Sequence, residues 1–327
     1  MKTRIKYLDF AKAIGVFLVV LGHMPSLVPE PIRMWIFSFH MPLFFIASGY
    51  FAKMPNSINA VKKQLVRKTQ KLLFGGYLTF AAVFLLFDSL IYKLSIADIL
   101  DTIKSILLGS IDKVYWFFLC LFVVSVLFIL ITIVVKDYKK LIAIAFVFAA
   151  VSLLLKMAGI NYYRIGSALY SFGFYLIGFL IKEKQIFERI KDRASVFVVC
   201  IFVSVVGSGL ALGFWPKILD INNNYSHDIV INYLLAIAGS YMVFFTSFII
   251  CEKIGEMFAT KLLIFIGMNS MVFFPVLDYM PGALSTVLNN SSVVIKMSSY
   301  LIGFIIASLI SLVLKVIKGV VNKECLK

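Results

Sequence analysis

Ten separate apolar runs constrain this 327-residue chain more than any other feature, because each is long enough to cross a lipid bilayer at about 20 residues per crossing. With 61% hydrophobic residues, 15% charged residues and a mean hydropathy of +0.99, the chain cannot be a soluble globule. We therefore expect an all-α, polytopic membrane protein with about ten transmembrane helices. The runs cover roughly residues 10–28, 33–52, 72–92, 114–135, 141–157, 165–181, 195–215, 229–250, 262–280 and 293–314.

The positions of Lys and Arg predict how these runs are oriented. With a cytoplasmic N-terminus, 24 of the 32 basic residues fall on the cytoplasmic side, as the positive-inside rule requires. We therefore expect both termini in the cytoplasm and a location in the cell membrane, inner or plasma, among membrane lipids. Because topology explains the basic charge, no nucleic acid partner is expected. The eight basic residues left outside are Arg33, Lys93, Lys104, Lys113, Lys156, Arg164, Lys217 and Lys296.

No long hydrophilic insertion interrupts the runs, so we expect a single transmembrane domain over residues 1–327. The outer segment 94–113 carries apolar residues at helical spacing between charged ones, which predicts a helix lying on the outer membrane interface. The three histidines are far apart in the sequence, and no metal-binding cluster is expected.

Residues 7–51 place ionisable side chains inside the first two runs: Asp9, Lys12, His23 and His40. Such groups are costly in hydrocarbon and by default mark a functional site. Eleven residues separate Lys12 from His23, and eleven helical steps of about 100° bring a side chain back to nearly the same face. The two side chains therefore share one stripe, roughly 16 Å apart along the axis. A long, thin ligand can touch both.

Each of these groups also has a structural interpretation. Lys12 is the right distance from Asp9 for an i,i+3 ion pair, with its ammonium reaching the inner membrane surface. His40 is equally well explained as a packed histidine bonded to a neighbouring carbonyl. Arg67, Lys68 and Lys71 fall on about one helical face and suit a phosphate-rich cytosolic ligand, although any cytoplasmic loop is basic.

Five segments make the chain resemble the acyltransferase 3 family of integral membrane O-acyltransferases, especially the members that acetylate bacterial polysaccharides. The resemblance extends over most of the chain in order. It departs from the family at three places. Lys12 stands where the family often has Arg, and Gly76 stands where the family has the Pro of a Pro-Tyr pair. Leu277, which is followed by Asp278, stands where the family often has a histidine late in the chain. The segments are LDFAKAIGVFLVVLGH at 8–23, FHMPLFFIASGYF at 39–51, RKTQKLLFGGY at 67–77, YWFFLCLF at 115–122 and FIGMNSMVFF at 265–274.

The resemblance implies an acetyl transfer from cytosolic acetyl-CoA, with no permanently bound cofactor, to a hydroxyl of a cell-surface glycan or its lipid-linked precursor. The resemblance also implies that the phosphates of acetyl-CoA are held by Lys12, Arg67, Lys68 and Lys71, with Asp9 as a supporting residue. The thioester would reach His23, which acts either as general base or as a transient acyl carrier. Both mechanisms remain open.

The depth of certain residues in the membrane and the chemistry of their side chains suggest which residues bind the acceptor. We expect a sugar hydroxyl to enter from the outer half of the membrane into a pocket lined by His40, Ser48, Trp116, Asn269 and Ser270. Trp116 suits a sugar ring but is equally an interfacial belt residue, and Ser48 next to Gly49 is typical of close helix packing. The alternative function is a multi-span transporter of a small solute or lipid-linked glycan.

Overall fold

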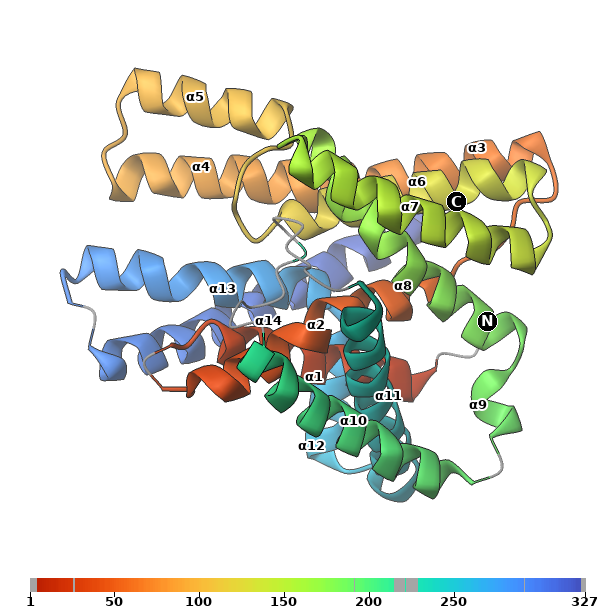
Figure 1. Ribbon diagram of the computed structural model, residues 1–327. Helices are drawn as coiled ribbons and strands as arrows, with labels where there is room; N and C mark the ends of the chain where they lie inside the picture. Colours follow the sequence, from red (N-terminus) through yellow and green to blue (C-terminus); the bar gives the residue numbers. More distant parts are fainter. Residues whose placement is uncertain are drawn as a thin grey trace. The chain divides into compact units, whose positions relative to one another are not determined.

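The computed structural model describes residues 5–25, 27–190, 192–214, 221, 229–290 and 292–324, and within them the chain is helical with no strand (Figure 1). The predicted all-α fold is confirmed. The helices are α1 (Lys6–Gly22), α2 (Glu30–Tyr50), α3 (Ile58–Lys68), the π-helix η1 (Thr69–Leu78), α4 (Thr79–Ile91), α5 (Ile96–Leu107), α6 (Trp116–Val134), α7 (Tyr138–Met157), the 3₁₀-helix η2 (Tyr162–Arg164), α8 (Ile165–Glu183), α9 (Ile186–Arg189), α10 (Arg193–Phe214), α11 (Ile229–Ile254), α12 (Phe258–Met268), α13 (Ser270–Val287) and α14 (Val293–Glu324).

The membrane character is also confirmed, but the helices observed at the first and ninth predicted runs differ from the expected single long spans. In the described part of the chain, eight helical segments are long and apolar enough to cross a membrane, and α12 with α13 makes a ninth crossing if this pair, bent by 87°, is one span. The first run is α1, whose 17 residues cover roughly 25 Å, close to the ~30 Å hydrocarbon core. It ends at Gly22, well before residue 28, because Pro25 disfavours a helical backbone at Met24.

By its internal contacts the chain divides into two compact units, Met1–Val28 with Ser247–Lys327 and Pro29–Thr246. In the first unit, α1 lies against α12 at Gly267, where an added methyl group would overlap the carbonyl oxygen of Asp9. Further along, α13 packs on α14, with the rings of Phe273 and Phe304 5.4 Å apart. Small residues let membrane helices approach this closely.

The second unit is built around α2 and α8. A methyl group on Gly49 would overlap the carbonyl oxygen of Tyr175, and one on Gly178 would overlap that of Ile46. The two helices therefore touch backbone to backbone, which only glycine permits. Around this pair, α7 packs on α8, and α10 is joined to α2 by the Trp35 indole, which donates to the Ser204 hydroxyl at 2.8 Å.

The predicted interfacial helix is α5, which is shorter than the segment 94–113. It begins with a capping box between Ser95 and Asp98. It ends because Gly109 adopts a left-handed backbone (φ 63°), and the amide of Ser110 donates back to the carbonyl of Ser105 at 3.0 Å. Ile96 is 79% exposed, so the apolar side of α5 remains uncovered by the rest of the unit.

Candidate functional site

Asp9 and Lys12 form the ion pair that their spacing predicted. The Lys12 ammonium lies 2.6 Å from Asp9 Oδ1, and both groups are largely buried, with 21% and 5% of their side chains exposed. The carboxylate stands on the face of α1 that packs against α12, since Gly267 abuts the Asp9 backbone. Asp9 thus fixes the direction of the Lys12 side chain within α1.

His23 is the C-cap residue of α1 and lies directly beyond the last helical turn. Its Nδ1 is 2.8 Å from the carbonyl oxygen of Val19. Because a carbonyl oxygen only accepts hydrogen bonds, Nδ1 carries the proton, and in the neutral ring Nε2 carries the lone pair. The helix end therefore selects the tautomer in which Nε2 is the basic nitrogen. With 47% of its side chain exposed, the imidazole is accessible within its unit.

Asp278 on α13 is a neighbour of His23 that sequence reasoning did not assign. Its Oδ1 lies 3.8 Å from His23 Nδ1, and 25% of its side chain is exposed. A carboxylate at this distance stabilises a positive charge on the imidazole ring. Two signals pointed to it: Asp278 is an acidic residue within an apolar run, and it follows Leu277, where the similar family frequently has a histidine.

His40 lies in the second unit and is buried on α2. Its Nδ1 is 3.0 Å from the carbonyl oxygen of Ile36, and its ring meets Phe37 edge to face at 4.9 Å between centroids. This is the arrangement expected of a packed histidine, and it selects the same tautomer as at His23. Contact between His40 and the acceptor stays a prediction.

The basic residues before the third span differ in how far they are exposed. Lys68 is half-buried, with its ammonium 3.4 Å from the Tyr175 hydroxyl, whereas Arg67 and Lys71 are exposed. The π-helix η1 begins at Thr69, so Lys71 lies in π-helical rather than α-helical backbone. The shared face of Arg67, Lys68 and Lys71 stays a prediction.

Besides His40, two more of the predicted acceptor residues, Trp116 and Ser48, lie in the second unit. Trp116 is the first residue of α6 and is 7% exposed, with its ring at 6.2 Å from that of Phe117. Ser48 is half-buried on α2, next to the glycine that contacts α8. The packing role anticipated for the Ser-Gly pair is therefore carried by Gly49.

Asn269 and Ser270 mark the break between α12 and α13 in the first unit. Asn269 donates its side-chain amide to the carbonyl of Phe265 at 2.8 Å and ends α12, and Ser270 begins α13. The 87° bend at this point turns the chain sharply. The Asn269 side chain donates a hydrogen bond to a backbone carbonyl at the end of α12, so it stabilises the helix end in addition to any role in binding.

Among the described residues, no three His, Cys, Asp or Glu side chains are grouped as metal ligands. Cys120, Cys200 and Cys251 are free thiols, and Cys325 lies outside the described part.

Comparison with known proteins gives one result. Residues 5–317 match a family model described as "Acyltransferase domain", which covers essentially the whole described chain. No curated protein and no solved structure matches the chain.

Proposed function

Because this chain belongs to the acyltransferase 3 family, a group of membrane acyltransferases, we propose that it is an O-acetyltransferase. It moves an acetyl group from cytosolic acetyl-CoA to a hydroxyl of a cell-surface glycan or of its lipid-linked precursor. The observation that carries this proposal is the arrangement of His23, whose Nδ1 is held by Val19 while the carboxylate of Asp278 lies 3.8 Å away. A histidine held in one tautomer beside a carboxylate is suited to acyl transfer.

Two reaction sequences fit this geometry. In the first, Nε2 of His23 removes the proton of the acceptor hydroxyl as the oxygen attacks the thioester carbonyl, and the proton then passes to the departing CoA thiolate. In the second, Nε2 itself attacks the thioester and CoA leaves as the thiolate. The acceptor hydroxyl then takes the acetyl group from the imidazolium, and the hydroxyl proton neutralises the thiolate. In both, the ring becomes positively charged, and Asp278 stabilises that charge.

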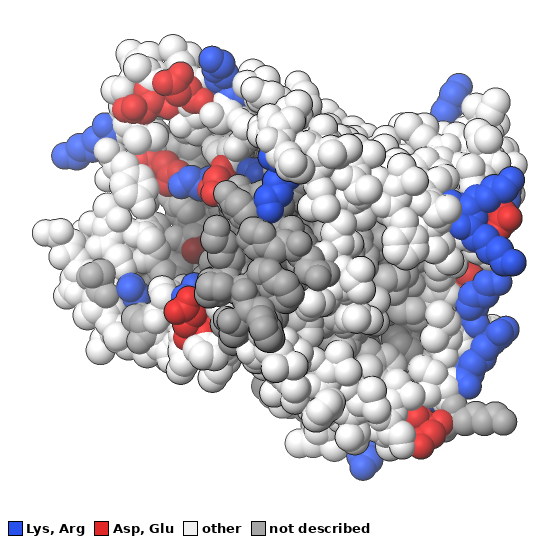
Figure 2. Space-filling view, in the orientation of Figure 1, with Lys and Arg blue, Asp and Glu red and all other residues white. Residues whose placement is uncertain are grey.

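Binding of the donor, acetyl-CoA, is assigned to the basic residues. CoA carries several phosphates, and Lys12, Arg67, Lys68 and Lys71 supply positive charge for them. Asp9 orients Lys12 through the 2.6 Å ion pair. In the second unit, Figure 2 shows Lys and Arg gathered over the end where α7 begins and α8 finishes, and acidic side chains gathered over α5. This charge separation supports a cytoplasmic position for the basic end.

The acceptor side is assigned to His40 and Trp116, with Ser48, Asn269 and Ser270 as further contacts. Trp116 offers an indole next to the outer segment that precedes α6, and an aromatic ring stacks well on the apolar face of a sugar. His40 is held rigidly by Ile36, which suits a residue that positions a substrate.

The decisive experiment incubates the purified protein with labelled acetyl-CoA and a panel of candidate glycans. We expect label on the glycan with the wild type and none with His23→Ala, at equal expression and membrane insertion. The matched control is His227→Ala, the third histidine of the chain, which lies outside the described residues and is expected to retain activity. Near-normal transfer by His23→Ala contradicts the assignment, and glycan movement without acetylation favours a transporter.

A rapid-quench measurement without acceptor separates the two reaction sequences. Label retained on the wild-type protein but not on His23→Ala supports the acyl-histidine relay. Release of CoA only when the acceptor is present supports general-base catalysis.

A further inference from the structure

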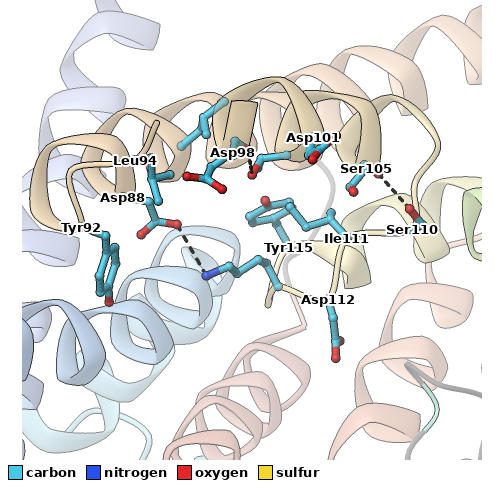
Figure 3. Close-up of a pocket in the computed structure, with 13 residues that line it drawn as sticks. Asp88, Tyr92, Leu94, Asp98, Asp101, Ser105, Ser110, Ile111, Asp112 and Tyr115 are labelled. Atoms are coloured by element: carbon cyan, nitrogen blue, oxygen red, sulfur yellow. Dashed lines mark hydrogen bonds and ion pairs between the residues drawn. The ribbon is translucent and has the colours of Figure 1, made fainter. Parts of the chain in front are cut away.

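A pocket of about 520 Å³ opens between α4, α5 and the segment that precedes α6 (Figure 3). It lies wholly within the second unit, and no residue assigned above to acetyl transfer lines it. Its volume falls within the range of ~300–1,000 Å³ that is usual for small-molecule sites. The pocket therefore requires an explanation of its own.

The lining is acidic and rich in hydroxyl groups. Asp88, Asp98, Asp101 and Asp112 line it together with a single cation, Lys113, whose ammonium is 3.5 Å from Asp88 Oδ2. The Ser95 hydroxyl and backbone amide donate to the Asp98 carboxylate and lower its pKa, which further favours the charged form. The resulting negative potential excludes the phosphates of CoA and other anionic ligands.

Tyr115 provides an independent sign of a ligand. The residue is 2% exposed, its ring packs against Tyr77 and Phe84, and Figure 3 shows it reaching into the space between α5 and the Asp88–Lys113 ion pair. Among the described residues its hydroxyl has no hydrogen-bond partner. Tyr115 lines the pocket, so its hydroxyl can donate to an acceptor that another molecule supplies.

The pocket wall behind Tyr115 is held in place by the segment before α8. Tyr163 and Arg164 both adopt left-handed backbones (φ 52° and 56°), which non-glycine residues rarely do. From this conformation the Tyr163 amide donates to the carbonyl of Leu108 at 2.9 Å, and the Arg164 guanidinium donates to the carbonyl of Ile111, which itself lines the pocket. Such fixed walls reduce the ordering cost of binding.

Two ligand classes are excluded by the same residues. In the described part of the chain no three carboxylates converge as metal ligands, so a divalent cation does not explain the pocket. A lipid tail does not fit a lining of aspartates, Thr102, Ser105 and Ser110. The remaining chemistry is that of a molecule with many hydroxyl donors, which carboxylates accept, and an oxygen acceptor for Tyr115.

We infer that this pocket binds a neutral or amino sugar unit of the acceptor glycan. The four carboxylates accept from sugar hydroxyls or an amine, Tyr115 donates to a sugar oxygen, and Tyr92, which is 46% exposed, offers a ring face. The identification of the ligand as part of the acceptor rests on the proposed acetyl transfer. Under the predicted orientation the pocket faces outward, where a cell-surface glycan is found.

The test measures sugar binding without any donor. Calorimetry on the full-length protein in detergent uses di- to tetrasaccharides of glucose, galactose, N-acetylglucosamine and glucosamine, with a uronic-acid disaccharide as the anionic probe. We expect binding of at least one neutral or amino sugar, and about tenfold weaker binding in Tyr115→Phe and in Asp101→Asn. Both changes keep side-chain shape. The controls are Tyr162→Phe and Asp137→Asn, which lie outside the pocket and are expected to bind as the wild type does.

A kinetic measurement separates this inference from the proposed function. In acetyl transfer, both pocket variants are expected to raise KM for the acceptor about tenfold and to leave kcat and KM for acetyl-CoA unchanged. Wild-type transfer with no effect of either variant on acceptor binding overturns the pocket assignment and leaves the transferase standing. Pocket-dependent sugar binding without any acetyl transfer supports the site and overturns the proposed function. Absence of sugar binding, or tighter binding of the anionic probe, overturns the inference.

Discussion

The imidazole of His23 combines two contacts from opposite ends of the chain. Val19, one turn earlier in α1, sets which nitrogen carries the proton. Asp278, on α13, supplies a negative charge at 3.8 Å. A hydrogen-bonded carboxylate–histidine pair is shorter than this, so Asp278 acts on the charge of the ring more than on its orientation. The orientation is already set by Val19.

Removing the charge of Asp278 is therefore expected to slow transfer without abolishing it. Asp278→Asn keeps the side-chain shape and should lower kcat by roughly 10- to 100-fold, less than the largest effects of general acid–base groups. KM for both substrates and the thermal unfolding temperature should stay unchanged, and Asp278→Glu should restore part of the activity. Steady-state measurements of kcat and KM for both variants test this prediction. An unchanged kcat in Asp278→Asn would show that the carboxylate plays no part.

Backbone contact between helices is the main feature at the level of secondary-structure elements. The packing of α2 on α8 depends on Gly49 and Gly178, and that of α1 on α12 depends on Gly267. At each position an added Cβ would overlap a carbonyl oxygen of the facing helix, which cannot move as a flexible side chain can. Two of these glycines lie in segments that resemble the family, so those segments serve packing as well as chemistry.

Gly178→Ala is expected to destabilise the second unit by about 1–3 kcal/mol, the usual cost of overpacking a close contact. The matched control is Gly282→Ala on α13, where an added Cβ meets no atom within 4 Å. There alanine should be neutral or stabilise the helix by up to about 1 kcal/mol. Thermal unfolding in detergent compares the two variants. Equal unfolding temperatures for Gly178→Ala and the wild type would contradict the described contact.

The N-terminus of α5 predicts a pH dependence. The Ser95 side chain, followed by its backbone amide, donates to Asp98 and lowers the pKa of this carboxyl below its usual value of 3.8. A lowered pKa means that the contribution to stability is present above pH 3.8 and is lost as the pH falls through the lower, folded-state value. A carbon NMR titration of labelled aspartate should place the Asp98 transition below 3.8 in the wild type and nearer 3.8 in Ser95→Ala. Identical transitions would contradict the capping box.

For the whole molecule, the predicted orientation in the membrane accounts for the net charge of +16. The orientation predicts that the turn before α3 faces the cytoplasm and that η2 faces outward. In a protein whose native cysteines have been replaced, a membrane-impermeant thiol reagent should label Tyr162→Cys in intact cells. It should label Asn56→Cys only after permeabilisation. Both positions are exposed, so access to solvent does not bias the comparison. Labelling of position 56 in intact cells would reverse the topology.

The sequence by itself determined the helical membrane architecture, the approximate limits of the spans and the family. These properties depend on local composition and on short segments such as residues 8–23, which can be read one stretch at a time. The Asp9–Lys12 pair was predictable for the same reason, since a helix places residues three apart side by side.

Only the tertiary structure decided the contacts between distant segments. Asp278 faces His23 because α13 folds back near the end of α1, and Tyr115 is buried in an acidic pocket because three elements meet there. The π-helix η1, which begins at Thr69, was not predicted either. Periodicity describes one helix at a time, whereas these features follow from packing between helices and from hydrogen-bond registers that packing selects.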